Sequence, residues 1–270
     1  MKEGGGESTT SVFAGIFSLL ILAEITTTIT KSGGLFLYFV ALFISIFYVS
    51  LVKKDIYIVS LTLPPLLRIL DLSMPIFFPY TIYLFPLVYF PVFPSVYMAV
   101  KALDLRTEDL GFTLRRWYLF IPAGFLIGYL LSYPEFLILH PSSLIPDLTL
   151  KSFVTLFIVM YVFVAFVEEL VFRSVLQSSL EREFGLKKGL LLASVIFAVM
   201  HSGFGYLETI YALFAGLLMG FVFQRTKSLP FVIMIHGTIN VMVFGIFHLR
   251  GVESILFFRG MSIAYSLLGV

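Results

Sequence analysis

The sequence contains no cysteine. Disulfide bonds, thiolate metal sites and a cysteine nucleophile are therefore excluded. Charge is also scarce, since Asp, Glu, Lys and Arg make up 13% of the 270 residues, whereas soluble domains carry about 25%. The formal net charge is only +2, and we find no basic stripe of the kind that binds nucleic acid.

Apolar residues are abundant instead. They account for 59% of the chain, which includes 31 Phe and 14 Tyr, and the mean hydropathy is +1.02. A soluble protein of this length could not bury so much apolar surface. The composition therefore predicts an all-α fold, a polytopic transmembrane helix bundle whose first partner is membrane lipid.

A helix needs about 20 apolar residues to cross the hydrocarbon core. Nine segments approach this length. The third contains Pro64, Pro65, Arg68 and Asp71, which leaves three alternatives for it: a kinked span, a re-entrant segment, or a segment merged with its neighbour. We therefore expect eight or nine spans. The segments are roughly 11–30, 35–52, 55–71, 81–101, 117–137, 152–178, 189–205, 207–225 and 229–248.

Basic residues orient the bundle through the positive-inside rule. They gather in every second loop between the predicted spans, and these loops lie on the same side of the membrane. Segment 138–150, on the other side, has no Lys or Arg. We expect the basic loops to be cytoplasmic and segment 138–150 to lie outside. The residues concerned are Lys53, Lys54, Lys101, Arg106, Arg115, Arg116, Arg182, Lys187, Lys188, Arg225 and Lys227.

Two adjacent carboxylates, Glu168 and Glu169, follow about fifteen nearly apolar residues, and Arg173 comes four residues after Glu169. Ionisable groups in hydrocarbon are costly, rare and usually functional. Positions four apart share a helix face, so Glu169 should pair with Arg173. Glu168 points about 100° away from Glu169 and is left without a partner on its own helix.

Three further polar residues, His201, His236 and Asn240, lie within later spans. With span boundaries near 178, 189 and 230, a rise of about 1.5 Å per residue places Glu168, His201, His236 and Asn240 at similar depths, roughly 9 to 18 Å from the basic ends. The spacing predicts that they converge, although each alone more often has a structural role. Together they suit amide hydrolysis: a carboxylate can activate water, and imidazole and amide N–H groups can stabilise an oxyanion.

The ordered motifs Glu168-Glu169-Leu-Val-Phe-Arg173, Phe197-Ala-Val-Met-His201 and His236-Gly-Thr-Ile-Asn240 resemble those of the CAAX protease and bacteriocin-processing family, which includes the type II CAAX prenyl endopeptidase. The resemblance covers roughly residues 105–248 and implies an intramembrane endopeptidase. It implies that Glu168 activates the water, that His201 helps to hold it, and that His236 and Asn240 form the oxyanion site. It also implies that Glu169, Arg173 and Phe197 support the cavity.

The resemblance leaves two matters open. A metal-free glutamate mechanism without cofactor is favoured, and a zinc site on Glu168, His201 and His236 is the alternative, because three protein ligands plus water is the usual catalytic arrangement. The substrate is either a prenylated CAAX protein that loses its C-terminal tripeptide or another membrane-associated peptide. We expect a multi-pass protein of the cell membrane with a cavity accessible from the cytoplasmic side.

Four regions are expected along the chain. Residues 1–10 form a flexible tail without the marks of a cleavable signal peptide, 11–104 form N-terminal transmembrane helices, 105–250 form the catalytic core, and 251–270 form an apolar tail. Two other functions are kept as alternatives. One is a proton-coupled transporter, since buried Glu, His and Arg also make proton relays, and the other is a non-catalytic membrane scaffold.

Overall fold

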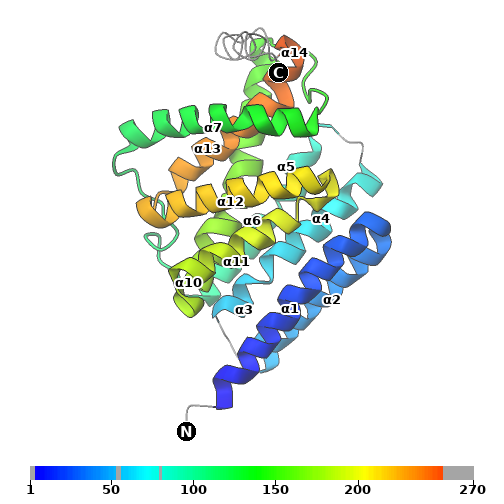
Figure 1. Cartoon of the computed structure of the whole chain (residues 1–270), viewed down its shortest axis with the longest axis vertical. Coiled ribbons are helices and arrows are strands. Elements are labelled where there is room, and N and C mark those ends of the chain that lie inside the picture. The colour runs from blue at the N-terminus through cyan, green and yellow to red at the C-terminus, as the bar shows by residue number, and fades with distance from the viewer. Residues whose placement is uncertain (1–3, 53–55, 79–80, 252–270) are drawn as a thin grey trace, which may run out of the picture.

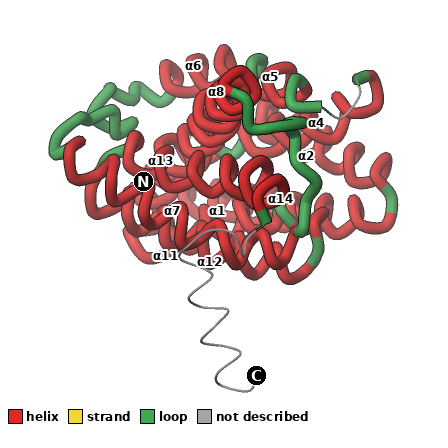
Figure 2. The backbone as a smooth tube through the Cα atoms, turned by 90° about the horizontal axis from the view of Figure 1, so that it is seen from above, coloured by secondary structure: helices red, strands yellow, loops and turns green. Residues whose placement is uncertain are grey.

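The structure is a computed structural model that describes residues 4–52, 56–78 and 81–251 (Figure 1). This part of the chain consists of helices, turns and loops, without any strand (Figure 2). The α-helices are α1 (Gly4–Ile29), α2 (Lys31–Leu51), α3 (Ile56–Ser60), α4 (Leu63–Phe77), α5 (Leu84–Tyr89), α6 (Val92–Ala102), α7 (Trp117–Leu139), α8 (Leu150–Ile158), α9 (Phe166–Glu169), α10 (Ser178–Phe184), α11 (Leu186–Val199), α12 (Tyr206–Thr226), α13 (Leu229–Val241) and α14 (Phe247–Arg250).

Three π-helical stretches join neighbouring α-helices directly, and one 3₁₀ turn lies between α11 and α12. They are η1 (Val159–Ala165), η2 (Leu170–Gln177), η3 (Ser202–Phe204) and η4 (Met242–Ile246). Through η1 and η2, helices α8, α9 and α10 form one continuous helix over 150–184, called the long helix below. The π-helical stretches lie on both sides of the glutamate pair, and such stretches occur often at functional sites.

Among the described residues, eight helices are long and apolar enough to cross a membrane. This confirms the predicted all-α bundle, and of the eight or nine spans expected it supports eight. The chain is a multi-pass membrane protein. The spans are Thr9–Ile29, Lys31–Leu51, Tyr57–Phe77, Leu84–Ala102, Trp117–Leu139, Leu150–Phe184, Tyr206–Thr226 and Leu229–Arg250.

The predicted span 189–205 is the one that is not among the eight membrane-spanning helices of the structure. Helix α11 has 14 residues and ends at Val199, so its length is about 21 Å, less than the hydrocarbon thickness of about 30 Å. The 3₁₀ turn η3 and Gly205, at φ 109°, then turn the chain into α12. The predicted end at residue 205 is therefore wrong, because the helix stops before His201, Ser202 and Gly203.

Smaller differences concern other predicted boundaries. The weak third span is helical but broken between α3 and α4, before Pro64 and Pro65, as its prolines suggested. Helix α1 begins at Gly4, so the described residues of the expected tail 1–10 are helical. The expected C-terminal tail lies, from residue 252 onward, outside the described residues.

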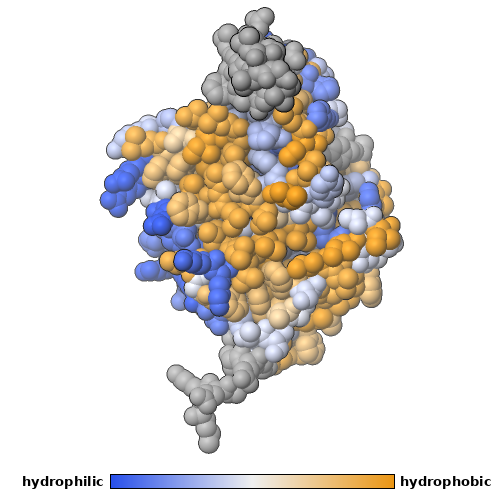
Figure 3. Space-filling model, in the orientation of Figure 1, coloured by the Kyte–Doolittle hydropathy of each residue, from blue (hydrophilic) through white to orange (hydrophobic). Residues whose placement is uncertain are grey.

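The basic loops meet at one end of the bundle, which we call the basic end (residues 103–116, 181–188 and 224–229). Arg182 Nη2 lies 2.9 Å from Asp109 Oδ1, and Lys227 Nζ lies 3.5 Å from Glu181 Oε2. The backbone N–H of Arg106, with the charge of Arg182, lowers the pKa of Asp109. Figure 3 shows hydrophilic residues gathered mainly along the left edge and an apolar surface over the middle of the bundle.

The long helix lies at the centre of the molecule and carries the glutamate pair. Every residue from Val167 to Glu181 is buried. Helix α13 packs against α7 along most of its length (Figure 1), and its residues Ile235 to Val241 are buried as well. The two helices that carry Glu168 and His236 are therefore held on several sides by protein rather than lipid.

Candidate active site

The four residues predicted as catalytic, Glu168, His201, His236 and Asn240, line a single cavity of about 400 Å³. They come from the long helix, the turn after α11, and α13. The predicted convergence of their depths therefore corresponds to a shared site in the structure. Phe197 lines the same cavity, whereas Glu169 and Arg173 lie behind its wall and are fully buried.

Of the adjacent pair Glu168 and Glu169, Glu168 is the carboxylate that faces the cavity. Its side chain is buried, and the hydroxyl of Tyr89 donates a hydrogen bond to its Oε1. Its other oxygen, Oε2, lies 3.9 Å from His236 Nε2, which is too far for a direct hydrogen bond. One oxygen of Glu168 is therefore fixed by Tyr89, and the other has no hydrogen-bond partner among the described residues.

Glu169 has the structural contacts that its spacing predicted. Its Oε2 lies 3.1 Å from Arg173 Nε, and both side chains have no exposed surface. The guanidinium carbon of Arg173 lies 4.6 Å from the centroid of the Phe197 ring, whose face attracts a cation. This confirms the pairing of Glu169 with Arg173 and gives Phe197 a contact with the same charge.

Glu169 also fixes His236, which the sequence did not indicate. Its Oε1 lies 2.8 Å from His236 Nδ1. A carboxylate can only accept, so Nδ1 carries a proton and Nε2 is directed to the Glu168 side. The ring therefore lies between the two carboxylates and is hydrogen-bonded to Glu169 alone, in the way that a buried acid orients a histidine.

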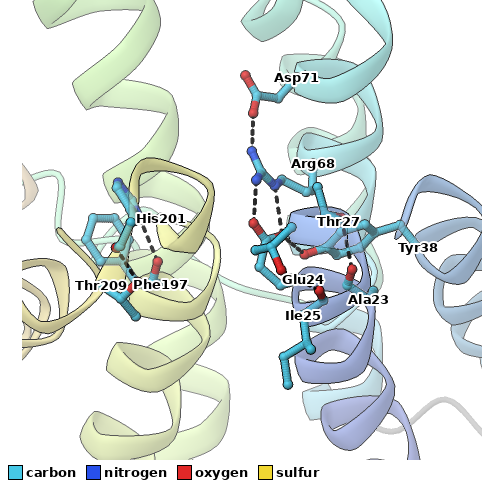
Figure 4. Close-up of polar contacts among 12 residues, drawn as sticks. Ala23, Glu24, Ile25, Thr27, Tyr38, Arg68, Asp71, Phe197, His201 and Thr209 are labelled. Carbon is cyan, nitrogen blue, oxygen red and sulfur yellow. Dashed lines mark hydrogen bonds and ion pairs between the residues drawn. The ribbon is translucent and has the colours of Figure 1, made fainter. Parts of the chain in front are cut away.

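His201 follows the last turn of α11 and is partly exposed to the cavity. Its Nδ1 lies 2.8 Å from the carbonyl oxygen of Phe197 (Figure 4). Because a carbonyl oxygen only accepts, Nδ1 carries the proton and Nε2 keeps a lone pair. The Phe197 ring centroid lies 4.5 Å from that of His201, so the imidazole is held from two sides.

Asn240 lies one turn after His236 on α13, is buried, and lines the cavity. Among the described residues, no hydrogen bond joins its side-chain amide to another group. A helix-bonding role, which is the more common one for a lone membrane Asn, would require such a partner. The amide is instead available to a molecule in the cavity.

A network around Arg68 forms another part of the cavity wall. Arg68 pairs with Asp71, and it also binds Glu24 of α1, with 3.0 Å between Arg68 Nε and Glu24 Oε2. Tyr38 donates to the same Glu24 (Figure 4). Arg68 and Asp71 line the cavity, and their polarity within an apolar span was the signal that could have found them.

Two more buried carboxyl groups, Glu135 of α7 and Glu208 of α12, line the cavity. The Tyr211 hydroxyl donates to the Leu131 carbonyl oxygen at 3.0 Å and lies beside Glu135. No site role was predicted from the sequence for Glu208, Glu135 or Tyr89. Tyr89 offered no signal, since it is one of 14 tyrosines in the chain.

The alternative zinc site does not fit this arrangement. Among the described residues, no three His, Asp or Glu side chains are grouped so that they could hold a metal ion. The Nδ1 hydrogen bonds of His236 to Glu169 and of His201 to a backbone carbonyl do not decide this point, because a metal-ligating histidine usually makes the same bonds with its other ring nitrogen. Glu168, His201 and His236 share the cavity without converging as ligands.

Comparison with known families is consistent with this site. Residues 150–242 match the family model described as type II CAAX prenyl endopeptidase Rce1-like. The matched region runs from the long helix through α13 and contains Glu168, His201, His236 and Asn240, but not α1 to α7. No curated protein and no solved structure matches the chain.

Proposed function

Because the chain carries an Rce1-like type II CAAX prenyl endopeptidase domain over residues 150–242, we propose that it is an intramembrane endopeptidase. Glu168 activates a water molecule that attacks a peptide bond bound in the cavity. His201 holds that water, and His236 and Asn240 stabilise the oxyanion. Glu169 and Arg173 are positioning residues, because they act through His236 and through the packing of the long helix.

One observation supports this assignment most strongly. Glu168 is held by Tyr89 through Oε1 alone, which leaves Oε2 directed to a cavity that His201, His236 and Asn240 also line. A general base needs such a fixed orientation together with a free lone pair. The 3.9 Å between Glu168 Oε2 and His236 Nε2 is too long for a direct hydrogen bond, so Glu168 Oε2 keeps its lone pairs for a water molecule in the cavity.

The reaction balances with the residues present. Glu168 Oε2 takes a proton from water as the water oxygen bonds to the peptide carbonyl carbon. The carbonyl oxygen becomes an oxyanion, to which the Asn240 side-chain N–H and a protonated His236 Nε2 donate. The C–N bond then breaks, and the proton held by Glu168 passes to the leaving amine. No covalent enzyme intermediate is formed.

The substrate is a membrane-associated peptide in this proposal. The cavity lies among helices that cross the membrane, and its walls combine the polar residues above with apolar side chains such as Met160, Val164 and Ile239. Such a site suits a peptide segment that enters from the membrane or its surface. A prenylated CAAX tail and another anchored peptide are both of this kind. They differ in the side of the membrane from which they would reach the cavity.

We propose further that catalysis needs no metal. The absence of a suitable ligand group among the described residues favours it. Metal analysis of active, chelator-treated protein tests this point. Cleavage that falls with the removal of a stoichiometric metal and returns on its addition would contradict it.

The test of the proposed function is cleavage of a peptide series, including a farnesylated CAAX peptide, by purified protein in detergent. Glu168→Gln removes the base but keeps the shape, so we expect kcat to fall by about 10²–10⁴ with little change in the unfolding temperature. Glu183→Gln alters an exposed acid on α10 and should cleave like wild type. Equal cleavage by wild type and Glu168→Gln, or measurable transport without any cleavage, would contradict the proposal.

A further inference from the structure

The two ends of the bundle differ in charge. The basic end contains Arg106, Arg115, Arg182, Lys187 and Lys227, and its loops are tied together, since the backbone N–H of Leu229 donates to the carbonyl oxygen of Gly111 at 2.8 Å. The opposite end is formed by the start of α2, the end of α4, the end of α7 and the start of α12. Near the membrane, a strong excess of Lys and Arg marks the cytoplasmic side.

The cavity opens at the opposite end. Its exposed lining residues are Lys31, Asp71, Pro75 and Phe204. Lys31 begins α2, Asp71 and Pro75 lie in the last turns of α4, and Phe204 lies in the turn before α12. These four residues, which we call the mouth, all belong to the end away from the basic loops.

Toward the basic end the cavity is closed by packed protein. Its lining residues there, Phe172 and Met219, are buried. From Glu168 the long helix continues to Phe184, about 24 Å further at a rise of 1.5 Å per residue, and the residues up to Glu181 are all buried. No lining residue on that side is exposed, so a substrate has no direct route from the basic loops to Glu168.

Cytoplasmic basic loops and a cytoplasmic cavity therefore cannot both hold for this chain. We propose that the mouth opens to the extracytoplasmic face, and that the substrates are peptide segments of secreted or membrane-anchored proteins presented there. This inference rests on the proposed function, because it concerns access to the same site. It disfavours the C-terminal tails of prenylated cytoplasmic proteins as substrates in the cell.

The chemistry of the mouth agrees with a peptide as the entering group. Lys31 and Asp71 place both signs of charge there, and Arg68 lies just behind, bound to Glu24. A long isoprenoid chain would have to pass these charges, at a cost in solvation. A hydrated peptide backbone can exchange hydrogen bonds with them as it enters.

The absence of cysteine allows a direct test of orientation. Phe204→Cys places a thiol at the mouth, and Arg115→Cys places a matched thiol in an exposed basic loop. We expect a membrane-impermeant maleimide to label Phe204→Cys in intact cells and to label Arg115→Cys only after permeabilisation. The reverse pattern would overturn the extracytoplasmic assignment, and it would do so whether or not the protein cleaves peptides.

A second measurement tests the mouth itself. After purification, attachment of a polyethylene-glycol maleimide to Phe204→Cys should reduce cleavage at least tenfold, and the same label on Arg115→Cys should leave it unchanged. Pro75→Cys gives an independent mouth position if Phe204→Cys does not fold. Equal cleavage by the labelled Phe204→Cys protein and the labelled Arg115→Cys protein would overturn the inference. Failure of unlabelled wild-type protein to cleave would instead count against the proposed function.

Discussion

At the residue scale, the glutamate pair divides into two roles. Glu168 and Glu169 are neighbours in the chain, but helical geometry directs one to the cavity and the other to Arg173. That division could be predicted, since it depends only on the helical period. The bond between Glu169 and His236 could not, because it depends on how α13 packs against the long helix.

Tyr89 is the residue whose removal tests the orientation of Glu168. Tyr89→Phe keeps the ring and removes the hydroxyl that donates to Glu168 Oε1. Hydrogen bonds to charged groups contribute about 1.5–3 kcal/mol, so we expect kcat to fall roughly 10- to 100-fold, as measured by peptide cleavage. Tyr83→Phe, at an exposed position, is the matched control. Unchanged kcat in Tyr89→Phe would show that the bond does not orient the base.

Glu169 is the residue whose removal tests the buried ion pair. Glu169→Gln leaves Arg173 charged, fully buried and unpaired, and breaking one partner of such a pair costs about 3–5 kcal/mol. We expect a lower unfolding temperature in detergent together with slower cleavage, since His236 Nδ1 then faces a neutral amide instead of the charged carboxylate. Asp109→Asn breaks the exposed pair with Arg182 and should cost about 0–1 kcal/mol. A similar small effect for both variants would contradict the structural role.

At the element scale, helix α11 shows where apolar periodicity stops being informative. The length needed for a span predicted a helix to residue 205, yet α11 ends at Val199, before His201, Ser202 and Gly203. The cause is local backbone geometry, because Gly203 and Gly205 accommodate a 3₁₀ turn and a positive φ. The short helix has a functional result, since it places His201 at a helix end, where it caps the Phe197 carbonyl within the cavity.

The contact between α7 and α13 depends on glycine. A Cβ atom on Gly128 would overlap the Ile235 carbonyl oxygen and lie 2.7 Å from Thr238 Cβ. Small residues allow such close approach of membrane helices. We expect Gly128→Ala to destabilise the protein by about 1–3 kcal/mol in thermal unfolding, and to slow cleavage because Ile235 precedes His236. Gly15→Ala meets no atom within 4 Å and should not destabilise it. Equal unfolding temperatures for both variants would contradict the close packing.

At the scale of the whole molecule, the site is assembled from both halves of the chain. The family match and the motifs lie within 150–242, and from these the sequence could predict four cavity residues. Tyr89 and Arg68 come from the first half and line the same cavity. Their positions depend on long-range contacts of α4 and α5 with the long helix, which carry no spacing signal in the sequence.

This assembly predicts how a divided chain should behave. A fragment of residues 105–270 keeps the three motifs but lacks Tyr89, so we expect it to cleave at most as fast as the intact Tyr89→Phe variant. Co-production with residues 1–104 should restore cleavage and give co-purification, because α3, α4 and α6 pack against the long helix. Cleavage by the 105–270 fragment alone at the rate of the whole chain would contradict this.

The control for that experiment is a residues 1–104 fragment that carries Tyr89→Phe. It keeps the apolar helix faces that bring the fragments together, so co-purification should be unchanged. It lacks only the hydroxyl bonded to Glu168, so the restored rate should equal that of the intact Tyr89→Phe chain. Co-purification with full activity from this fragment would mean that the first half supplies packing alone, and that the base is oriented entirely within the second half.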